Sequence, residues 1–233
     1  MNKPALRLLD GRLAATAPAA AQPSPERSPY WSSPLRLAAK RLLDVSISAC
    51  LLAALLPLLL VLAAVVKLTS RGPVFYRWDV VGESRRRFAG YKFRSMVANA
   101  DALKLQLLRK NEMTGPVFKL THDPRITSLG AWMRRYSLDE LPQLYSVLIG
   151  DMSLVGPRPP LETEFVRFTD FQKQKLTVKP GITCLWQVSG RNRVHDFDDW
   201  VRLDLEYIRT WSLTLDLWIL VRTVGEVFRG SGK

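Results

Sequence analysis

The sequence predicts a mixed α/β fold, mainly helical, with a re-entrant, proline-broken membrane helix hairpin and a cytosolic domain that contains a small β-hairpin and interfacial amphipathic helices. Three observations predict this class. No charged residue occurs from Val45 to Val66, and Pro57 interrupts this run. Two runs of β-branched and aromatic residues then flank a polar turn that contains glycine. Farther along, leucines recur at helical spacing, and an apolar C-terminal stretch carries charges.

The first 32 residues are rich in alanine, proline and serine and show no apolar periodicity. We therefore expect a disordered tail over residues 1–32. Ser33 and Pro34 fit an N-cap and the first position of a helix. We expect an N-terminal helix and membrane segment over residues 33–67 and a cytosolic domain over residues 68–233.

The uncharged run has 22 residues and would be roughly 33 Å long as one helix, just enough to span a bilayer. Pro57 lacks a backbone donor and clashes with the carbonyl of Ala53, so a re-entrant hairpin and a kinked spanning helix both fit. Arg36, Lys40 and Arg41 precede the run and further basic residues follow it. The positive-inside rule then places both ends in the cytoplasm and favours the re-entrant, monotopic form.

In the domain, we expect a β-hairpin near residues 73–80 and 87–93 and a helix over residues 97–112. The C-terminal stretch "WSLTLDLWILVRTVGEVF" carries too many charges to span a membrane. Its Trp211 and Trp218 suit a helix in the membrane interface, but the same pattern fits a buried core helix.

The charge balance indicates polyanionic partners. The chain has 34 Lys and Arg against 21 Asp and Glu, which favours nucleic acid, an acidic membrane surface or phosphorylated substrates. The two cysteines, Cys50 and Cys184, are too few for a disulfide framework or a thiolate zinc site.

Adjacent carboxylates in "RRYSLDELPQL" are the main candidates for chemistry. Asp139 and Glu140 could be surface residues, or Glu140 could form a capping box with Ser137. Pro142 argues against the box, because its missing N–H would be needed there. A helix that begins at Pro142 leaves both acids in the entry turn, near the positive end of the helix dipole. That environment keeps a carboxylate ionised, as a nucleophile or metal ligand requires.

Basic residues in several other segments could accompany these acids. Prolines stiffen the loop around Arg158, which suits phosphate recognition, and Lys92 and Arg94 share one face of a strand. A single cation of this kind is more often a solvated charge than a ligand. Cations from several loops around paired acids are nevertheless typical of phosphoryl transfer with a metal.

The chain resembles the bacterial sugar transferases, monotopic phosphoglycosyl transferases that load a sugar phosphate onto polyprenyl phosphate, in their minimal catalytic form. The resemblance runs from Lys40 to the C-terminus and rests on motifs that occur in order: "KRLLDV", "GPVFYR", "YKFRSM", "SLDELPQL", "GDMSLVGPRP", "KPGIT", "WQVSGR" and "LDLEYI". It implies a helix that turns back at Pro57 and a catalytic domain on the cytoplasmic face of the bacterial inner membrane.

The resemblance also implies the chemistry. Asp139 would attack the β-phosphate of a nucleotide sugar, which we expect to be a UDP sugar, and release the nucleoside monophosphate. Undecaprenyl phosphate would then accept the hexose phosphate. Glu140, with Asp139, would hold Mg²⁺. The predicted phosphate-binding residues are Lys92, Arg94, Arg134, Arg158 and Arg191. Membrane lipid is a further expected partner, nucleic acid is not, and a homo-oligomer is compatible with the sequence.

Two other hypotheses remain. A basic module could bind anionic lipid or nucleic acid by charge alone, without Asp139 or a metal. A non-catalytic scaffold for other assembly enzymes would also function without Asp139.

Overall fold

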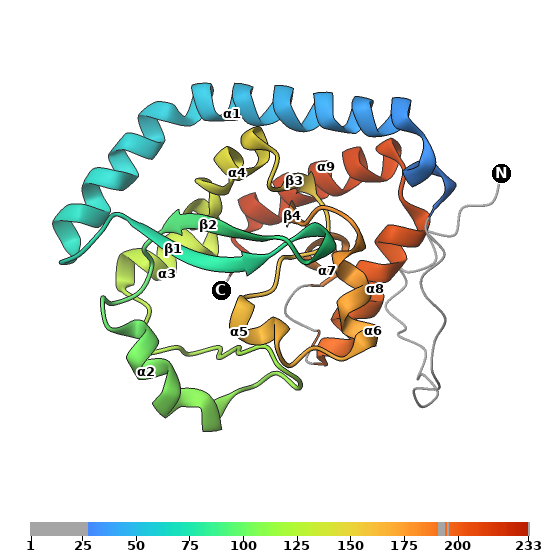
Figure 1. Ribbon diagram of the computed structural model, residues 1–233. Helices are drawn as coiled ribbons and strands as arrows, with labels where there is room; N and C mark the ends of the chain where they lie inside the picture. The colour runs from blue at the N-terminus through green and yellow to red at the C-terminus, as the bar shows by residue number, and fades with distance from the viewer. Residues whose placement is uncertain (1–27, 191–193, 195, 233) are drawn as a thin grey trace.

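The computed structural model describes residues 28–190, 194 and 196–232, so Arg191 lies outside the described residues. The predicted mixed fold, mainly helical, is confirmed (Figure 1). Strands β1 (Phe75–Val81) and β2 (Arg87–Phe93) form the expected antiparallel hairpin. Strands β3 (Ser153–Val155) and β4 (Gly181–Thr183) form a second, parallel pair. Other helices are α2 (Ala100–Leu107), α3 (Ser128–Arg135), α4 (Gln143–Ile149), α5 (Glu162–Phe165), α6 (Asp170–Lys173), α7 (Leu185–Val188), α8 (Phe197–Thr210) and α9 (Leu213–Arg229).

Helix α1 (Pro34–Thr69) starts where the sequence predicted, directly after Ser33. It continues through Pro57 as one helix, so the predicted two-armed hairpin is not confirmed. Figure 1 shows α1 crossing the top of the molecule and then bending downward. The reason is that a proline removes only one backbone hydrogen bond of the helix. It bends the helix without ending it when its neighbours are good helix formers, as the flanking leucines are.

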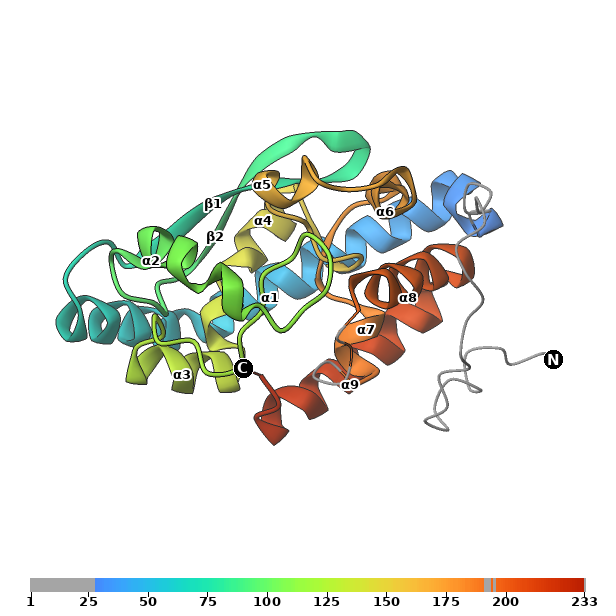
Figure 2. The same ribbon diagram turned by 90° about the horizontal axis from the view of Figure 1, so that it is seen from below.

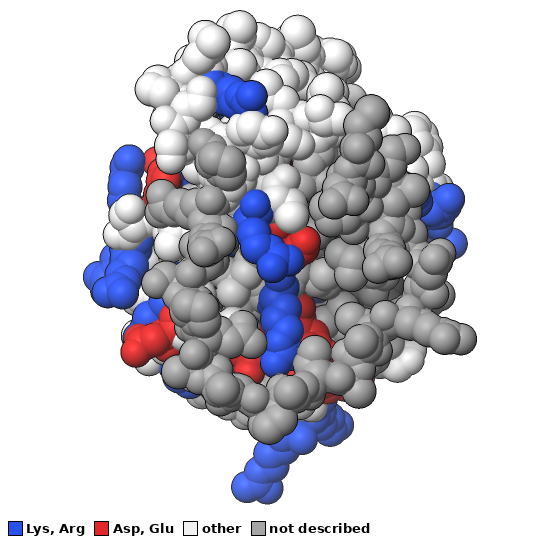
Figure 3. All heavy atoms as spheres, turned by 90° about the vertical axis from the view of Figure 1, so that its right-hand side faces the viewer, with Lys and Arg blue, Asp and Glu red and all other residues white. Residues whose placement is uncertain are grey.

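Along the described chain, α1 is the one helix long and apolar enough to cross a membrane. Its two halves contact different parts of the domain, since α9 lies beside the first half and β2 and α3 lie beside the second (Figures 1 and 2). Leu62 and Val66 of the second half pack with Phe93 and Met133. On the face in Figure 3, the upper part, where α1 lies, is mostly uncharged, and most charged side chains lie below it.

The predicted disordered tail is wrong for its last five residues. Pro29–Ser32 forms a 3-10 turn. The ring of Trp31 stacks on Trp211 at 4.2 Å, and its Nε1 donates to the carbonyl of Ile208 at 2.8 Å. A half-buried tryptophan that packs in this way offsets part of the entropy of ordering a short segment. The prediction for residues 1–27 falls outside the described residues.

The two remaining helix predictions concern α2 and α9. The helix expected over residues 97–112 is confirmed with shorter bounds, because it appears as α2 followed by a 3-10 turn. Helix α9 combines the two alternatives for the C-terminal stretch. Its inner face buries Asp216 and Ile219 in the main core, while its outer face exposes an apolar stripe. The stripe consists of Leu217, Val221, Val224 and Phe228.

Candidate active site

The paired carboxylates lie in a 3-10 turn, Leu138–Glu140, between α3 and α4. Helix α4 begins immediately after Pro142, so the predicted entry turn is confirmed. The capping box is not formed, because Ser137 adopts a left-handed φ of 54° and its side chain makes no capping bond. Asp139 is buried and Glu140 is half-buried. The fold therefore presents two adjacent acids on a tight turn, rather than on a solvated helix face.

Three of the predicted cations converge on this turn from separate elements. Lys92 comes from β2, Arg134 from the last turn of α3 and Arg158 from the loop after β3. Arg158 Nη1 donates to Glu140 Oε1 at 3.3 Å. The charges of the two arginines and of both acids all act on the pKa of Lys92. The five charged groups thus share one site.

The electrostatics of the site favour binding of an anion. Burial, and then the neighbouring charge of Arg134, lowers the pKa of Lys92 to about 8, although Asp139 opposes the shift. Burial also lowers the pKa of Arg134. For Arg158, burial acts in the same direction and is the largest single cause, but the neighbouring groups, led by the carboxylate of Glu140, together outweigh it and the pKa is raised. Because three cations face two carboxylates, a phosphate group would relieve the excess positive charge.

A cavity of about 390 Å³ adjoins these cations and is lined by Lys92, Arg134 and Arg158 together with aromatic side chains. This volume is typical of a small-molecule site. A much smaller cavity, of about 20 Å³, is lined by Glu140, Lys92 and Arg158. The described linings of these two cavities leave out Asp139, which is 5% exposed.

The family model described as bacterial sugar transferase matches residues 35–230. The chain belongs to this family. It is 50% identical over 161 residues to the galactosyl transferase CpsE of Streptococcus agalactiae serotype III, covering 69% of this chain and 36% of that protein. It is 44% identical over 197 residues to an undecaprenyl-phosphate galactose phosphotransferase of Salmonella typhimurium. This match covers 83% of this chain and 41% of that protein.

This sugar transferase therefore spans about two fifths of the length of those two relatives. By contrast, it matches the exopolysaccharide production protein ExoY of Rhizobium meliloti over most of both chains. That pair is 39% identical over 199 residues, which cover 84% of this chain and 88% of ExoY.

Arg94 has a different environment from the other predicted cations of the sugar transferase. It lines the large cavity, but its guanidinium donates to the Ser70 carbonyl and hydroxyl at 2.7 Å each, and also to the carbonyl of Pro73. These acceptors lie at and just beyond the C-terminal end of α1, where helix carbonyls lack partners. We therefore leave Arg94 out of the phosphate site and assign it to holding this helix end.

Sequence reasoning missed a second charged pair in the cavity wall. Lys175 Nζ lies 2.5 Å from Asp204 Oδ2, and both side chains are buried. The ammonium also lies 5.2 Å from the ring centroid of Trp200. Burial raises the pKa of Asp204, and Lys175 opposes the shift. The only signal was that Asp204 belongs to "LDLEYI", while nothing distinguished Lys175 from the other lysines.

The donor set decides which metal would suit the sugar transferase. Among the described residues, no group of three or more His, Cys, Asp or Glu could hold a metal ion. Asp139 and Glu140 together supply two carboxylates on one turn. Mg²⁺ commonly binds one or two carboxylates and completes its shell with water and substrate phosphates. The pair therefore fits Mg²⁺ bound jointly with a diphosphate substrate.

Proposed function

We propose that this sugar transferase moves a hexose 1-phosphate from a UDP sugar to undecaprenyl phosphate, as the first membrane step of polysaccharide synthesis. The observation that carries the proposal is the convergence of Lys92, Arg134 and Arg158 on the Asp139–Glu140 turn beside a cavity of suitable size. The names of two relatives support it, one an undecaprenyl-phosphate galactose phosphotransferase and one a UDP-glucose:undecaprenyl-phosphate glucose-1-phosphate transferase.

In the first step, a carboxylate oxygen of Asp139 attacks the β-phosphorus of the donor. A bond forms between this oxygen and phosphorus, the bond from phosphorus to the bridging oxygen breaks, and UMP leaves with the electron pair. Lys92, Arg134 and Arg158 neutralise charge on the transferred phosphoryl group and on UMP. Since Asp139 is 5% exposed, donor binding has to uncover it, and catalytic contacts often tighten only in the substrate complex.

In the second step, a phosphate oxygen of undecaprenyl phosphate attacks the same phosphorus. The bond between phosphorus and Asp139 breaks, which returns the free carboxylate and yields an undecaprenyl diphosphate sugar. The same three cations serve both steps, because charge develops around one phosphorus in each.

Asp139 and Glu140 would hold Mg²⁺, which supplies charge neutralisation on the diphosphate when bound. We expect EDTA to abolish turnover and added Mg²⁺ to restore it. The measurement is UMP release over a Mg²⁺ titration. Full activity in EDTA would rule out the metal.

The membrane placement is also a proposal. We propose that α1 inserts re-entrantly into the bacterial inner membrane, with both ends in the cytoplasm, and that the apolar stripe of α9 lies against the same surface. The exposed, uncharged middle of α1 and its bend support this. In a Cys50→Ala background, cysteines placed at residues 30 and 230 should both resist an impermeant thiol reagent from the periplasm. Labelling of residue 30 alone would instead indicate a spanning helix.

The covalent intermediate is tested by intact-protein mass after incubation with UDP-glucose or UDP-galactose and Mg²⁺, without lipid acceptor. We expect a hexose phosphate adduct and UMP in the wild type and neither with Asp139→Asn. Asp79→Asn removes an exposed carboxylate on β1 and should behave as wild type. An adduct that persists in Asp139→Asn would overturn the assignment of the nucleophile. Unchanged turnover to lipid in that variant would show that catalysis does not need Asp139, whereas no turnover in the wild type with either sugar would favour the charge-binding or scaffold hypothesis.

A further inference from the structure

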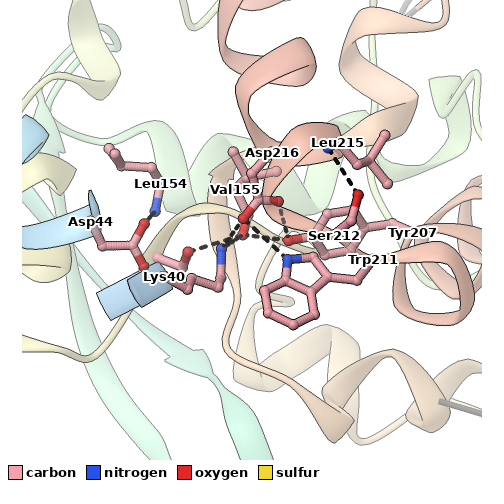
Figure 4. A network of polar contacts seen from close by, with 10 residues as sticks. Lys40, Asp44, Leu154, Val155, Tyr207, Trp211, Ser212, Leu215 and Asp216 are labelled. Atoms are coloured by element: carbon pink, nitrogen blue, oxygen red, sulfur yellow. Dashed lines mark hydrogen bonds and ion pairs between the residues drawn. The ribbon is translucent and has the colours of Figure 1, made fainter. Parts of the chain in front are cut away.

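One face of the N-terminal third of α1 packs against the domain, and it is this face that carries buried charged side chains. Lys40 is 7% exposed and Asp44 is 6% exposed, and Arg41 between them is half-buried. All three belong to the "KRLLD" sequence. Charged side chains are rarely buried unless they are paired, so each should have a partner in the domain. Figure 4 shows the contacts of Lys40 and Asp44.

Lys40 connects α1 to α9 and to the end of β3. Its Nζ lies 2.6 Å from Asp216 Oδ2 and donates to the Val155 carbonyl at 3.2 Å (Figure 4). Asp216 also accepts from Tyr207 Oη at 2.8 Å and from Trp211 Nε1 at 3.1 Å. A carboxylate with three donors from separate positions has one favourable orientation, so the pair fixes α1 against the core.

Asp44 holds the same strand from the next turn of α1. Its Oδ1 accepts from the backbone N–H of Leu154 at 3.0 Å. Together with the bond from Lys40 to Val155, this fixes the backbone of two adjacent residues of β3. Arg158 follows Val155 by three residues, and the intervening Pro157 limits the freedom of that short connection. The position of Arg158 therefore depends on α1.

Arg41 makes the corresponding connection to the dyad. Its Nη1 donates to the Val147 carbonyl at 2.6 Å, and its Nη2 donates to the Leu148 carbonyl at 2.8 Å. Both carbonyls belong to the last turn of α4, at the negative end of the helix dipole, where a cation is favourable. Helix α4 starts three residues after Glu140 and is only seven residues long. A shift at its C-terminal end is thus passed to the dyad turn.

We propose that Arg41 is a positioning residue that, with Lys40 and Asp44, locks the membrane helix to the two segments that carry the dyad and Arg158. It acts on the acceptor step more than on the donor step. A nucleotide sugar is soluble and can reach the site at any tilt of the domain. The phosphate of a polyprenyl acceptor is confined to the headgroup layer, so the site must be held at that depth. This inference rests on the proposed function.

The test compares Arg41→Gln with Arg41→Lys and with Arg36→Gln in lipid nanodiscs. Arg36 lies on the exposed face of the same helix, 3.6 Å over the Tyr30 ring, and gives an equal change in charge. We expect Arg41→Gln to slow transfer from the preformed adduct to undecaprenyl phosphate by about 10–100-fold, because a domain that tilts on α1 moves the site away from the headgroup layer and small misplacements cost this much. Adduct formation should change by less than about threefold, or under 0.7 kcal/mol. Arg41→Lys should keep part of the transfer rate.

Hydrogen exchange gives a readout that does not need activity. In Arg41→Gln we expect faster exchange at residues 138–150 and unchanged exchange in α8, with the melting temperature within a few degrees of wild type. Equal slowing of both steps, or unchanged exchange at residues 138–150, would overturn the proposal. If the wild type forms no adduct at all, the proposed function fails, and the exchange comparison still decides whether α1 positions the dyad. If Arg41→Gln does not fold, Arg41→Lys carries the same comparison.

Discussion

Two groups of charged side chains in this protein are built in different ways. The clamp cluster ties α1 to the domain, and its charged members are Lys40, Asp44 and Asp216. The dyad cluster adjoins the cavity and consists of Lys92, Arg134, Asp139, Glu140 and Arg158. In the clamp cluster each charge meets an opposite charge or a backbone group inside the core. In the dyad cluster the cations outnumber the acids.

The difference separates charges that hold the fold from charges that await a ligand. Burial raises the pKa of Asp216, but Lys40 opposes the shift, and no described clamp residue lines either of the two cavities. In the dyad cluster, burial and then the neighbouring charge of Arg134 lower the pKa of Lys92 to about 8, and Lys92 lines both cavities. A titratable side chain with a shifted pKa that faces a cavity is a mark of a functional site. We therefore expect variants in the clamp cluster to lose stability and variants in the dyad cluster to lose activity.

The largest effect on stability should come from Lys40→Met. It leaves Asp216 buried without its cation, which typically costs about 3–5 kcal/mol. Denaturant titration in detergent measures the free energy of unfolding. The double variant Lys40→Met with Asp216→Leu should recover most of the loss, because an apolar pair of similar volume replaces a buried ion pair at little cost. If Lys40→Met lowered the free energy of unfolding by less than about 1 kcal/mol, the clamp cluster would not be the group of charges that holds the fold.

The next effect should be kinetic. Arg158→Gln removes a cation that, in the proposed function, neutralises the transferred phosphoryl group, so we expect kcat/KM for the donor to fall about 10²–10³-fold. Its free energy of unfolding should change by less than about 1 kcal/mol, because the ion pair with Glu140 is partly solvated. Arg87→Gln breaks an exposed pair with Glu162 and serves as the control. If Arg158→Gln lost as much free energy of unfolding as Lys40→Met, this arginine would belong with the charges that hold the fold.

A pH dependence should follow from Lys92. Its lowered pKa means that the ammonium is charged below pH about 8 and loses its proton above it, whereas a free lysine stays charged to higher pH. Donor binding needs the charge, so kcat/KM for the donor should fall by up to about tenfold per pH unit above this value. Lys92→Arg should shift the alkaline limb beyond about pH 10. A wild-type profile that is flat to pH 10 would contradict the assignment.

Elements whose formation depends on a few neighbouring residues were predicted correctly from the sequence. A serine followed by proline marked the start of α1, and the missing N–H of Pro142 placed the dyad in an entry turn. Alternating β-branched and aromatic residues marked the β1–β2 hairpin within two residues. These signals depend on a few neighbouring residues and are not overridden by tertiary contacts.

The partners of individual cations could not be predicted in the same way. Lys92 and Arg94 give the same signal in sequence, yet β2 ends at Phe93 and Arg94 turns to the C-terminal end of α1. Lys40 and Arg41 read as charges at a membrane surface, but their acceptors are more than 100 positions away in the chain. Such long-range contacts depend on the completed fold, and neither spacing nor composition records them.

The smallest effect should come from an ion pair with nearly the same geometry as the clamp but without its burial. Arg229 Nη1 lies 2.8 Å from Glu226 Oε1, against 2.6 Å for Lys40 and Asp216, yet its side chain is 70% exposed and that of Lys40 is 9% exposed. We expect Arg229→Ala to change the free energy of unfolding by about 0.5 kcal/mol at most, and less at high salt, because water and ions screen the pair. Denaturant titrations at two salt concentrations measure this. If Arg229→Ala lowered the free energy of unfolding as much as Lys40→Met, the proximity of opposite charges would explain both results. Burial would then not be the property that makes the clamp cluster stabilising.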